Sequence, residues 1–417
     1  MGRRDGMRPG AVLLCGLLGG LLGVLTLAGC QNSDASPSAD PTTAGSAPTT
    51  ATTRPAASAT PTAPVADPAH AVTPPGPRKG PVVPADVLVL AQDTIPDAVV
   101  RQVERIKGVT GVARISMANP SVEDRLLKVV AVDPASYRNF TPVLSADNQT
   151  LWDRIAGGEI AVDTSLRKVL APDGDGYVKL GADAEAPRIH VGAWAPQIPG
   201  AVDAVVNEKW GKALGMKPDN ALLVTSTSTA PDRVVGPIQA AVGRSASVQR
   251  LDVVARLGLD PQAVQMPVLY GAVAQAVGNY TYAFAGGQVV PSGAWVRSHI
   301  VTETVPILGS VTCNKALFPQ LKAALADVIK QGLTSKIHPS EYAGCYYPRF
   351  IAGTRSLSNH AFGLALDLNV PGNQRGTVGQ MDRSVVAIFE HWGFTWGGTW
   401  HYTDPMHFEM NRIVHPG

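Results

Sequence analysis

The 417-residue chain has few charged side chains and almost no net charge. Asp, Glu, Lys and Arg make up 16% of its residues, and the formal net charge at pH 7 is +2. No block of basic residues occurs after the first eight positions. A nucleic-acid-binding surface depends on clustered Lys and Arg side chains that neutralise phosphates. We therefore expect no nucleic-acid partner for this chain.

The chain also lacks a second long apolar run. Three arginines near the start precede an apolar run at residues 11–27, and no later run is long enough to span a bilayer. Residues 27–30, Leu-Ala-Gly-Cys, resemble the end of a bacterial lipoprotein signal, which implies removal of residues 1–29 and lipidation of Cys30. The protein would then be anchored by lipid at the outer face of the cytoplasmic membrane. A plain signal peptide and a short membrane anchor are the alternatives, and the export route stays open.

Cysteine is scarce, with four residues in the whole chain. Cys15 would be removed with the signal and Cys30 would carry the lipid, which leaves Cys313 and Cys345. Outside the cytoplasm such a pair forms a disulfide, and closing a loop of this length stabilises a fold by about 3 to 4 kcal/mol. Neither cysteine has a nearby cysteine partner of the kind that structural zinc sites use. We therefore predict a disulfide between them.

Large apolar residues are almost absent between residues 30 and 82. Ala, Pro, Thr and Ser dominate this stretch, which cannot bury enough apolar surface to offset the entropy of ordering. We therefore predict a disordered tether at residues 30–82. A flexible chain of this length reaches about 40 Å, which would carry a folded part from a membrane into a cell wall.

The remaining chain of roughly 330 residues is too long for one ordinary core, so we expect two domains. Residues 83–265 alternate strand-like runs with segments of helical spacing, and a similar order recurs in the second half. This pattern predicts an α+β domain with two related βαβ-like lobes. Residues 130–140 and 157–162 resemble the extracytoplasmic domains of bacterial transporter permeases of the lipoprotein-release type. That resemblance implies a binding or regulatory role, with an envelope protein as partner.

Residues 283–417 are predicted to form a smaller α+β domain around a central antiparallel sheet. Apolar and polar side chains alternate along residues 364–369 and again along residues 406–410, as in two strands that each bury one face. Helical spacing of apolar residues predicts covering helices at residues 315–332 and 384–393.

Three potential ligands of one metal ion occur on these strands or next to them. Asp367 and His407 lie on the polar faces of the two strands. His360 lies seven residues before Asp367, and Gly363 between them allows the chain to turn back toward the same point. Two imidazoles and one carboxylate leave the fourth position of a tetrahedral zinc ion open, as in catalytic zinc sites. We therefore predict a zinc site at these three side chains.

The same residues resemble the zinc D-Ala-D-Ala carboxypeptidases and the related L-alanyl-D-glutamate endopeptidases, which cut the stem peptide of peptidoglycan. That family has Ser-x-His, then Gly-x-Ala-x-Asp, then an acidic residue three places before a last His. Here these positions are Ser358, His360, Gly363, Ala365, Asp367, Asp404 and His407. The resemblance implies that the two histidines and Asp367 bind zinc. It also implies that Asp404, where many members have Glu, is the general base, and that Arg349 holds a substrate carboxylate.

Several assignments stay open on the sequence alone. Glu409 is an acceptor that orients a zinc ligand, a competing base or a solvated strand residue, and Ser358 is a further candidate for either of the first two roles. Arg355 is the alternative to Arg349 as the residue that holds the carboxylate. The activity is either removal of the terminal D-Ala or cleavage between L-Ala and D-Glu. A lipoprotein that only binds cell wall is the alternative to an enzyme. The acid at position 404 favours an enzyme, because binding alone requires no general base.

Overall fold

The computed structural model describes the following parts of the chain: residues 64, 67–123, 125–181, 185–227, 229–251, 264–351, 354 and 356–416. Residues Ala59–Gly417 form one compact unit. The predicted signal, the lipidation site Cys30 and most of the predicted tether lie outside the described residues. Within the described ranges, no helix is both long and apolar enough to cross a membrane.

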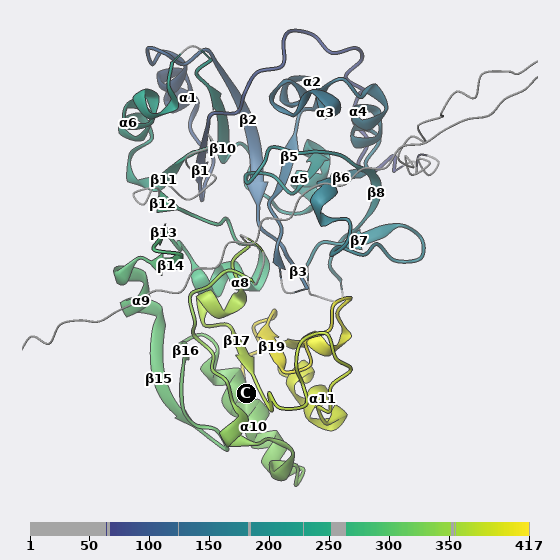
Figure 1. The fold of residues 1–417 in the computed structure, drawn as a ribbon, viewed down its shortest axis with the longest axis vertical. Coiled ribbons are helices and arrows are strands. Elements are labelled where there is room, and N and C mark those ends of the chain that lie inside the picture. Colours follow the sequence, from purple (N-terminus) through teal and green to yellow (C-terminus); the bar gives the residue numbers. More distant parts are fainter. Residues whose placement is uncertain are drawn as a thin grey trace, which may run out of the picture. The chain divides into compact units, whose positions relative to one another are not determined.

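Nine strands of the middle region, residues 67–251, form one sheet. They are β1 (Val87–Ala91), β2 (Gly111–Ala118), β5 (Val129–Val132), β6 (Ile160–Val162), β7 (Tyr177–Lys179), β8 (Arg188–Trp194), β9 (Ala204–Asn207), β10 (Ala221–Thr225) and β11 (Ala246–Arg250). Their order in the sheet is β11-β1-β10-β2-β5-β9-β6-β8-β7 (Figure 1). Neighbouring strands are antiparallel except for the parallel pairs β5–β9 and β6–β8.

Two strand–helix–strand units interleave at one end of this sheet. The first unit is β1, α1 (Asp97–Glu104) and β2, and the second is β10, α6 (Pro231–Val242) and β11. Strand β10 lies between β1 and β2, and β1 lies between β10 and β11, which is a split βαβ arrangement. The predicted βαβ-like units are therefore present but do not form two separate lobes. Local patterns predict each strand, whereas the insertion of one unit into the other depends on contacts between distant residues.

Helices cover both faces of the sheet. Helices α1 and α6 pack on one face through a cluster that contains Val103 and Ile238. The opposite face is covered by α2 (Pro134–Tyr137) and α4 (Gln149–Ala156), and there Tyr137 and Trp152 are buried against each other. Two further helices of this region are α3 (Val143–Ala146) and α5 (Glu208–Ala213).

The packed chain begins before residue 83. The Val72 amide donates a hydrogen bond to the Ala156 carbonyl at 2.7 Å, and the His70 ring stacks on Trp210 with ring centroids 3.6 Å apart. Residues 67–82, predicted to belong to the tether, thus pack against residues 83–251. These contacts, with the Arg78–Asp147 ion pair, involve polar groups and one aromatic ring, so they leave no apolar periodicity in the sequence from which packing could be predicted.

The C-terminal region, residues 264–416, contains a separate hydrophobic core. Its elements are β12 (Val264–Gln265), α8 (Gly271–Val277), β13 (Tyr282–Ala285), β14 (Gln288–Pro291), α9 (Gly293–His299), β15 (Ile300–Val305), β16 (Gly309–Asn314), α10 (Phe318–Lys330), β17 (Ala365–Asp367), α11 (Arg383–His391), β18 (Phe394–Trp396) and β19 (His407–Met410). Strands β17, β19 and β18 form an antiparallel sheet in that order. The predicted covering helices correspond to α10 and α11, whose apolar faces are buried in this core.

Cys313 on β16 and Cys345 form the predicted disulfide, across a sequence separation of 32 residues. Both cysteines are buried in the core of the C-terminal region. The disulfide therefore ties β16 to the segment that leads toward residues 358–367, where the sequence predicts the metal site.

Replacing both Cys313 and Cys345 with Ser is expected to lower the free energy of unfolding by about 3 to 4 kcal/mol, because the crosslink restricts the unfolded chain. Urea unfolding of the oxidised protein and of the double variant measures this difference. The wild-type protein under reductant should match the double variant. Equal unfolding midpoints in the oxidised protein and the variant would contradict the prediction.

Candidate metal centre

The two strands predicted from alternation are β17 and β19, and they pair antiparallel. Asp367 lies directly opposite His407 in the register of the pair. Opposed residues of an antiparallel pair project to the same face of the sheet, so the carboxylate and the imidazole come together on the polar face. On the other face, Leu366 and Phe408 are fully buried in the hydrophobic core, and this burial specifies the register.

His360 is presented by a short 3-10 helix, Asn359–Phe362, that precedes β17. The Ser358 hydroxyl caps this helix by accepting a hydrogen bond from the His360 amide at 3.3 Å. Gly363 ends the helix in the left-handed region, with φ +67°, and a Cβ there would lie 2.6 Å from the Asn314 backbone nitrogen. Glycine is thus required where the chain turns back toward the strand, as the sequence predicts.

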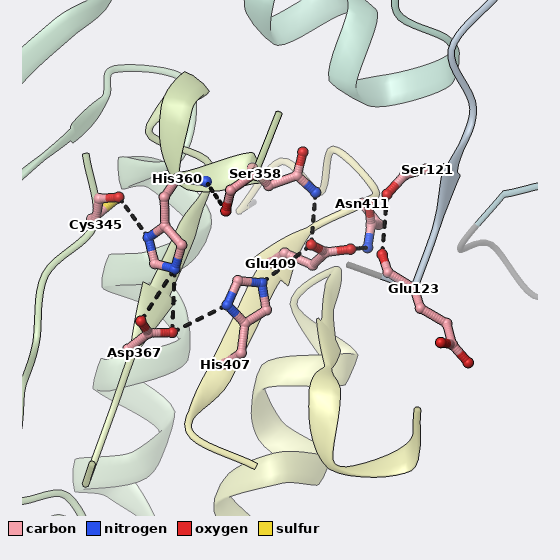
Figure 2. Close-up of polar contacts among 10 residues, drawn as sticks. Ser121, Glu123, Cys345, Ser358, His360, Asp367, His407, Glu409 and Asn411 are labelled. Atoms are coloured by element: carbon pink, nitrogen blue, oxygen red, sulfur yellow. Dashed lines mark hydrogen bonds and ion pairs between the residues drawn. The ribbon is translucent and has the colours of Figure 1, made fainter. Parts of the chain in front are cut away.

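The side chains of His360, Asp367 and His407 converge on one point (Figure 2). One potential ligand atom from each lies within 4.8 Å of the others. The His360 Nε2 atom lies 3.2 Å from Asp367 Oδ2, and the His407 Nδ1 atom lies 3.1 Å from Asp367 Oδ1. His360 and His407 are buried, at 3% and 4% exposure, so their positions are determined by packing.

The remaining ring nitrogen of each histidine is bound by an acceptor. The His360 Nδ1–H donates to the Cys345 backbone carbonyl at 2.8 Å. On the other ring, His407 Nε2–H donates to Glu409 Oε2 at 3.2 Å. Each acceptor holds a proton on the outer ring nitrogen, and the inner nitrogens, His360 Nε2 and His407 Nδ1, face Asp367. Binding of a metal requires the inner nitrogens to be free of protons, and such outer acceptors typically orient ligating histidines.

Glu409 is itself held in place by two asparagine side chains. The Asn359 amide donates to Glu409 Oε2 at 2.7 Å, and the Asn411 amide donates to Glu409 Oε1 at 2.8 Å. Glu409 is 1% exposed and lies on the Nε2 side of the His407 ring, away from the nitrogen that faces Asp367. Of the roles left open by the sequence, this geometry favours the orienting acceptor.

The electrostatics of the group favour a positive charge between its members. Burial by itself would raise the pKa of Asp367, but hydrogen bonds from His360 and His407 hold it well below its ordinary value. Burial would likewise lower the pKa of His407, whereas hydrogen bonds to Asp367 and Glu409 raise it to about 10. Two imidazole nitrogens and a carboxylate facing one point suit a divalent cation such as zinc. The donor set therefore fits the predicted ion.

The remaining predicted residues lie close to these strands in the chain. The Asp404 carbonyl accepts from the His407 amide at 3.0 Å, and its side chain is buried at 7% exposure. Asp404 is not a member of the three-residue group found among the described residues. The Arg349 carbonyl accepts from the Ser358 amide at 3.2 Å, which places that segment beside the chain leading to His360. Arg355 lies outside the described residues.

Three orienting groups were not predicted from the sequence: the Cys345 carbonyl, Asn359 and Asn411. A backbone carbonyl carries no signal in the sequence, because every residue has one. Asn411 follows Glu409 at the two-residue period of a strand, so continuing the alternation by one step would have found it. Asn359 lies between the capping serine and the first histidine, where the turn geometry, not a periodic pattern, determines its direction.

The geometry is that of a candidate metallohydrolase site, and comparison with known families agrees with that class. Residues 352–410 match the D-alanyl-D-alanine carboxypeptidase family. The matched segment contains Ser358, the three converging side chains and Asp404, and it ends before Asn411. It covers a small part of the chain and supports a peptidase for the C-terminal region. A search of curated proteins found no match to the chain.

Proposed function

We propose that the protein is a zinc-dependent peptidase that hydrolyses peptidoglycan stem peptides, acting as a D-alanyl-D-alanine carboxypeptidase. The observation that carries this proposal is the convergence of His360, Asp367 and His407, with the outer nitrogen of each imidazole held by an acceptor. The family match over residues 352–410 supports the peptidase class and the substrate. The disulfide in the C-terminal region agrees with a protein of an oxidising compartment.

Zinc would be held by His360 Nε2, a carboxylate oxygen of Asp367 and His407 Nδ1. When bound, it would polarise the scissile carbonyl and lower the pKa of the attacking water. Asp404 would accept a proton from that water and deliver it to the leaving amine. Glu409 would keep His407 in its ligating tautomer throughout, because its carboxylate holds the Nε2 proton.

Arg349 would hold the free carboxylate of the substrate. A guanidinium group donates two parallel hydrogen bonds to a carboxylate, which fixes orientation as well as charge. The Arg349 backbone is bonded to Ser358, two residues before His360. A carboxylate bound there would give the substrate a defined direction relative to the reacting carbonyl.

Mass spectrometry of muropeptides incubated with the zinc-loaded unit, residues 59–417, tests this function. Loss of the terminal D-Ala is the expected result. Cleavage between L-Ala and D-Glu would identify an endopeptidase instead and overturn the carboxypeptidase assignment. Intact muropeptides that nevertheless bind to the zinc-loaded protein would replace the enzyme with a cell-wall-binding protein.

We also propose that Cys30 carries lipid and anchors the protein at the outer face of the cytoplasmic membrane, on the basis of its position directly after Leu-Ala-Gly. Cys30→Ser is expected to abolish incorporation of labelled fatty acid and to release the protein from the membrane fraction. Cys15→Ser, inside the apolar run, is the matched control and should keep the label. Unchanged labelling and membrane retention in Cys30→Ser would show that a different segment anchors the protein.

A further inference from the structure

A short hairpin of the middle region reaches the C-terminal region. It consists of β3 (Ser121–Val122) and β4 (Arg125–Leu126). Leu126 is 4% exposed and belongs to the hydrophobic core of the C-terminal region, not to the cores of the middle region. At the base of the hairpin, the Val268 amide donates to Asn119 Oδ1 at 2.7 Å. The hairpin is therefore packed against the region that carries the candidate metal centre.

Glu123, in the turn of this hairpin, has an unusual backbone and a specific partner. Its φ is +53°, in the left-handed region that residues other than glycine rarely adopt. Its Oε1 atom accepts a hydrogen bond from the His401 amide at 2.8 Å. The favoured two-residue hairpin turns require a positive φ at this position, so the bond to the His401 amide, not the backbone angle, indicates a role for this residue.

The partner of Glu123 belongs to a loop, residues 397–404, that contains two side chains of the site. The Trp400 ring packs against the His407 ring, with centroids 5.2 Å apart, and Asp404 ends the loop. Between them, His401 is exposed and so has little packing of its own. The bond to Glu123 therefore fixes the backbone directly after Trp400 and three residues before Asp404.

The hairpin also lies against the other end of this segment. Ser121 and Asn411 both line a cavity of about 160 Å³, and the Ser121 hydroxyl donates to the Glu123 carbonyl at 3.3 Å (Figure 2). Asn411 donates to Glu409, which accepts from His407. The hairpin thus borders the segment from residue 401 to residue 411 at both ends, and that segment contains the proposed base and one proposed ligand.

We propose that Glu123 is a positioning residue for the peptidase reaction and that the hairpin of the middle region completes the catalytic site. This proposal rests on the proposed function. Glu123 acts through the His401 amide, by holding the loop so that Trp400 supports His407 and Asp404 stays in its working position. The expected effect is on turnover, because the Glu123 carboxylate bonds the loop that ends at the proposed base.

Glu123→Ala and Glu123→Gln in the zinc-loaded unit 59–417 test the proposal. Glu123→Ala removes the acceptor of the His401 amide, so kcat should fall about threefold to tenfold, the effect of losing one charge-assisted hydrogen bond. KM, zinc content and melting temperature should remain near the wild-type values. Glu123→Gln keeps an oxygen at the same position and should restore most of kcat. Glu104→Ala, at an exposed site on α1, is the matched control.

Amide hydrogen exchange of the peptide spanning residues 398–404 provides a second readout, independent of catalysis. Exchange should be faster in Glu123→Ala than in wild type and near wild type in Glu123→Gln. Wild-type kcat in Glu123→Ala, or unchanged exchange in that variant, overturns the proposal. If the wild-type protein hydrolyses no muropeptide, the proposed function fails and the catalytic role of Glu123 fails with it. Faster exchange in Glu123→Ala would in that case still show that Glu123 holds the loop in place.

Discussion

His360→Ala is expected to leave the protein without bound zinc and without peptidase activity. His360 contributes one of three donor groups, and its Nε2 atom lies 3.2 Å from Asp367 Oδ2. Catalytic zinc sites use three protein ligands, so the variant would retain only Asp367 and His407. Elemental analysis of the purified protein should give about one zinc per wild-type chain and almost none in the variant.

A histidine outside the group provides the control for this experiment. His391, at the end of α11, is exposed and is not part of the three-residue group. His391→Ala should therefore keep its zinc and its activity. Undiminished zinc in His360→Ala would show that the ion, if bound, is held elsewhere, and would remove the basis for the proposed mechanism.

The part of the site that could be predicted from sequence is the part determined by local rules. The two-residue period of a strand places Asp367 and His407 on polar faces. Burial of Leu364, Leu366 and Leu368 on the opposite side leaves one register in which both polar faces meet. The capping serine, the histidine and the glycine that turns the chain back are all within six residues. Short-range geometry therefore specifies the approach of His360 to the strand.

The part that could not be predicted depends on segments that meet only in the folded chain. The acceptor of His360 is the backbone carbonyl of a residue 15 positions earlier, held in place by the disulfide to Cys313. Glu123 lies 278 positions from its partner His401. In the sheet, β10 inserts between β1 and β2 although more than a hundred residues separate it from either. No periodicity within a segment encodes such contacts.

Asp404→Asn is expected to keep zinc and to bind stem peptide almost normally, while turnover falls about 100-fold to 10,000-fold, the usual effect of removing a general base. The substitution preserves the size of the side chain and removes its ability to accept a proton. The backbone bonds from Asp404 to Gly397 and His407 involve no side-chain atoms, so the local turn should survive. Zinc content, peptide affinity and the hydrolysis rate, measured on one preparation, separate these effects.

Glu409→Gln, measured alongside, distinguishes the two candidate bases because the structure gives them different surroundings. Both oxygens of Glu409 accept hydrogen bonds, and its contact to His407 is on the ring nitrogen that points away from Asp367. A glutamine there would lose one of these acceptors and loosen His407, so zinc affinity should fall about 10-fold to 100-fold. With zinc supplied in excess, Glu409→Gln should recover most of its activity, whereas Asp404→Asn should not. An active Asp404→Asn beside an inactive, zinc-saturated Glu409→Gln would transfer the role of base to Glu409.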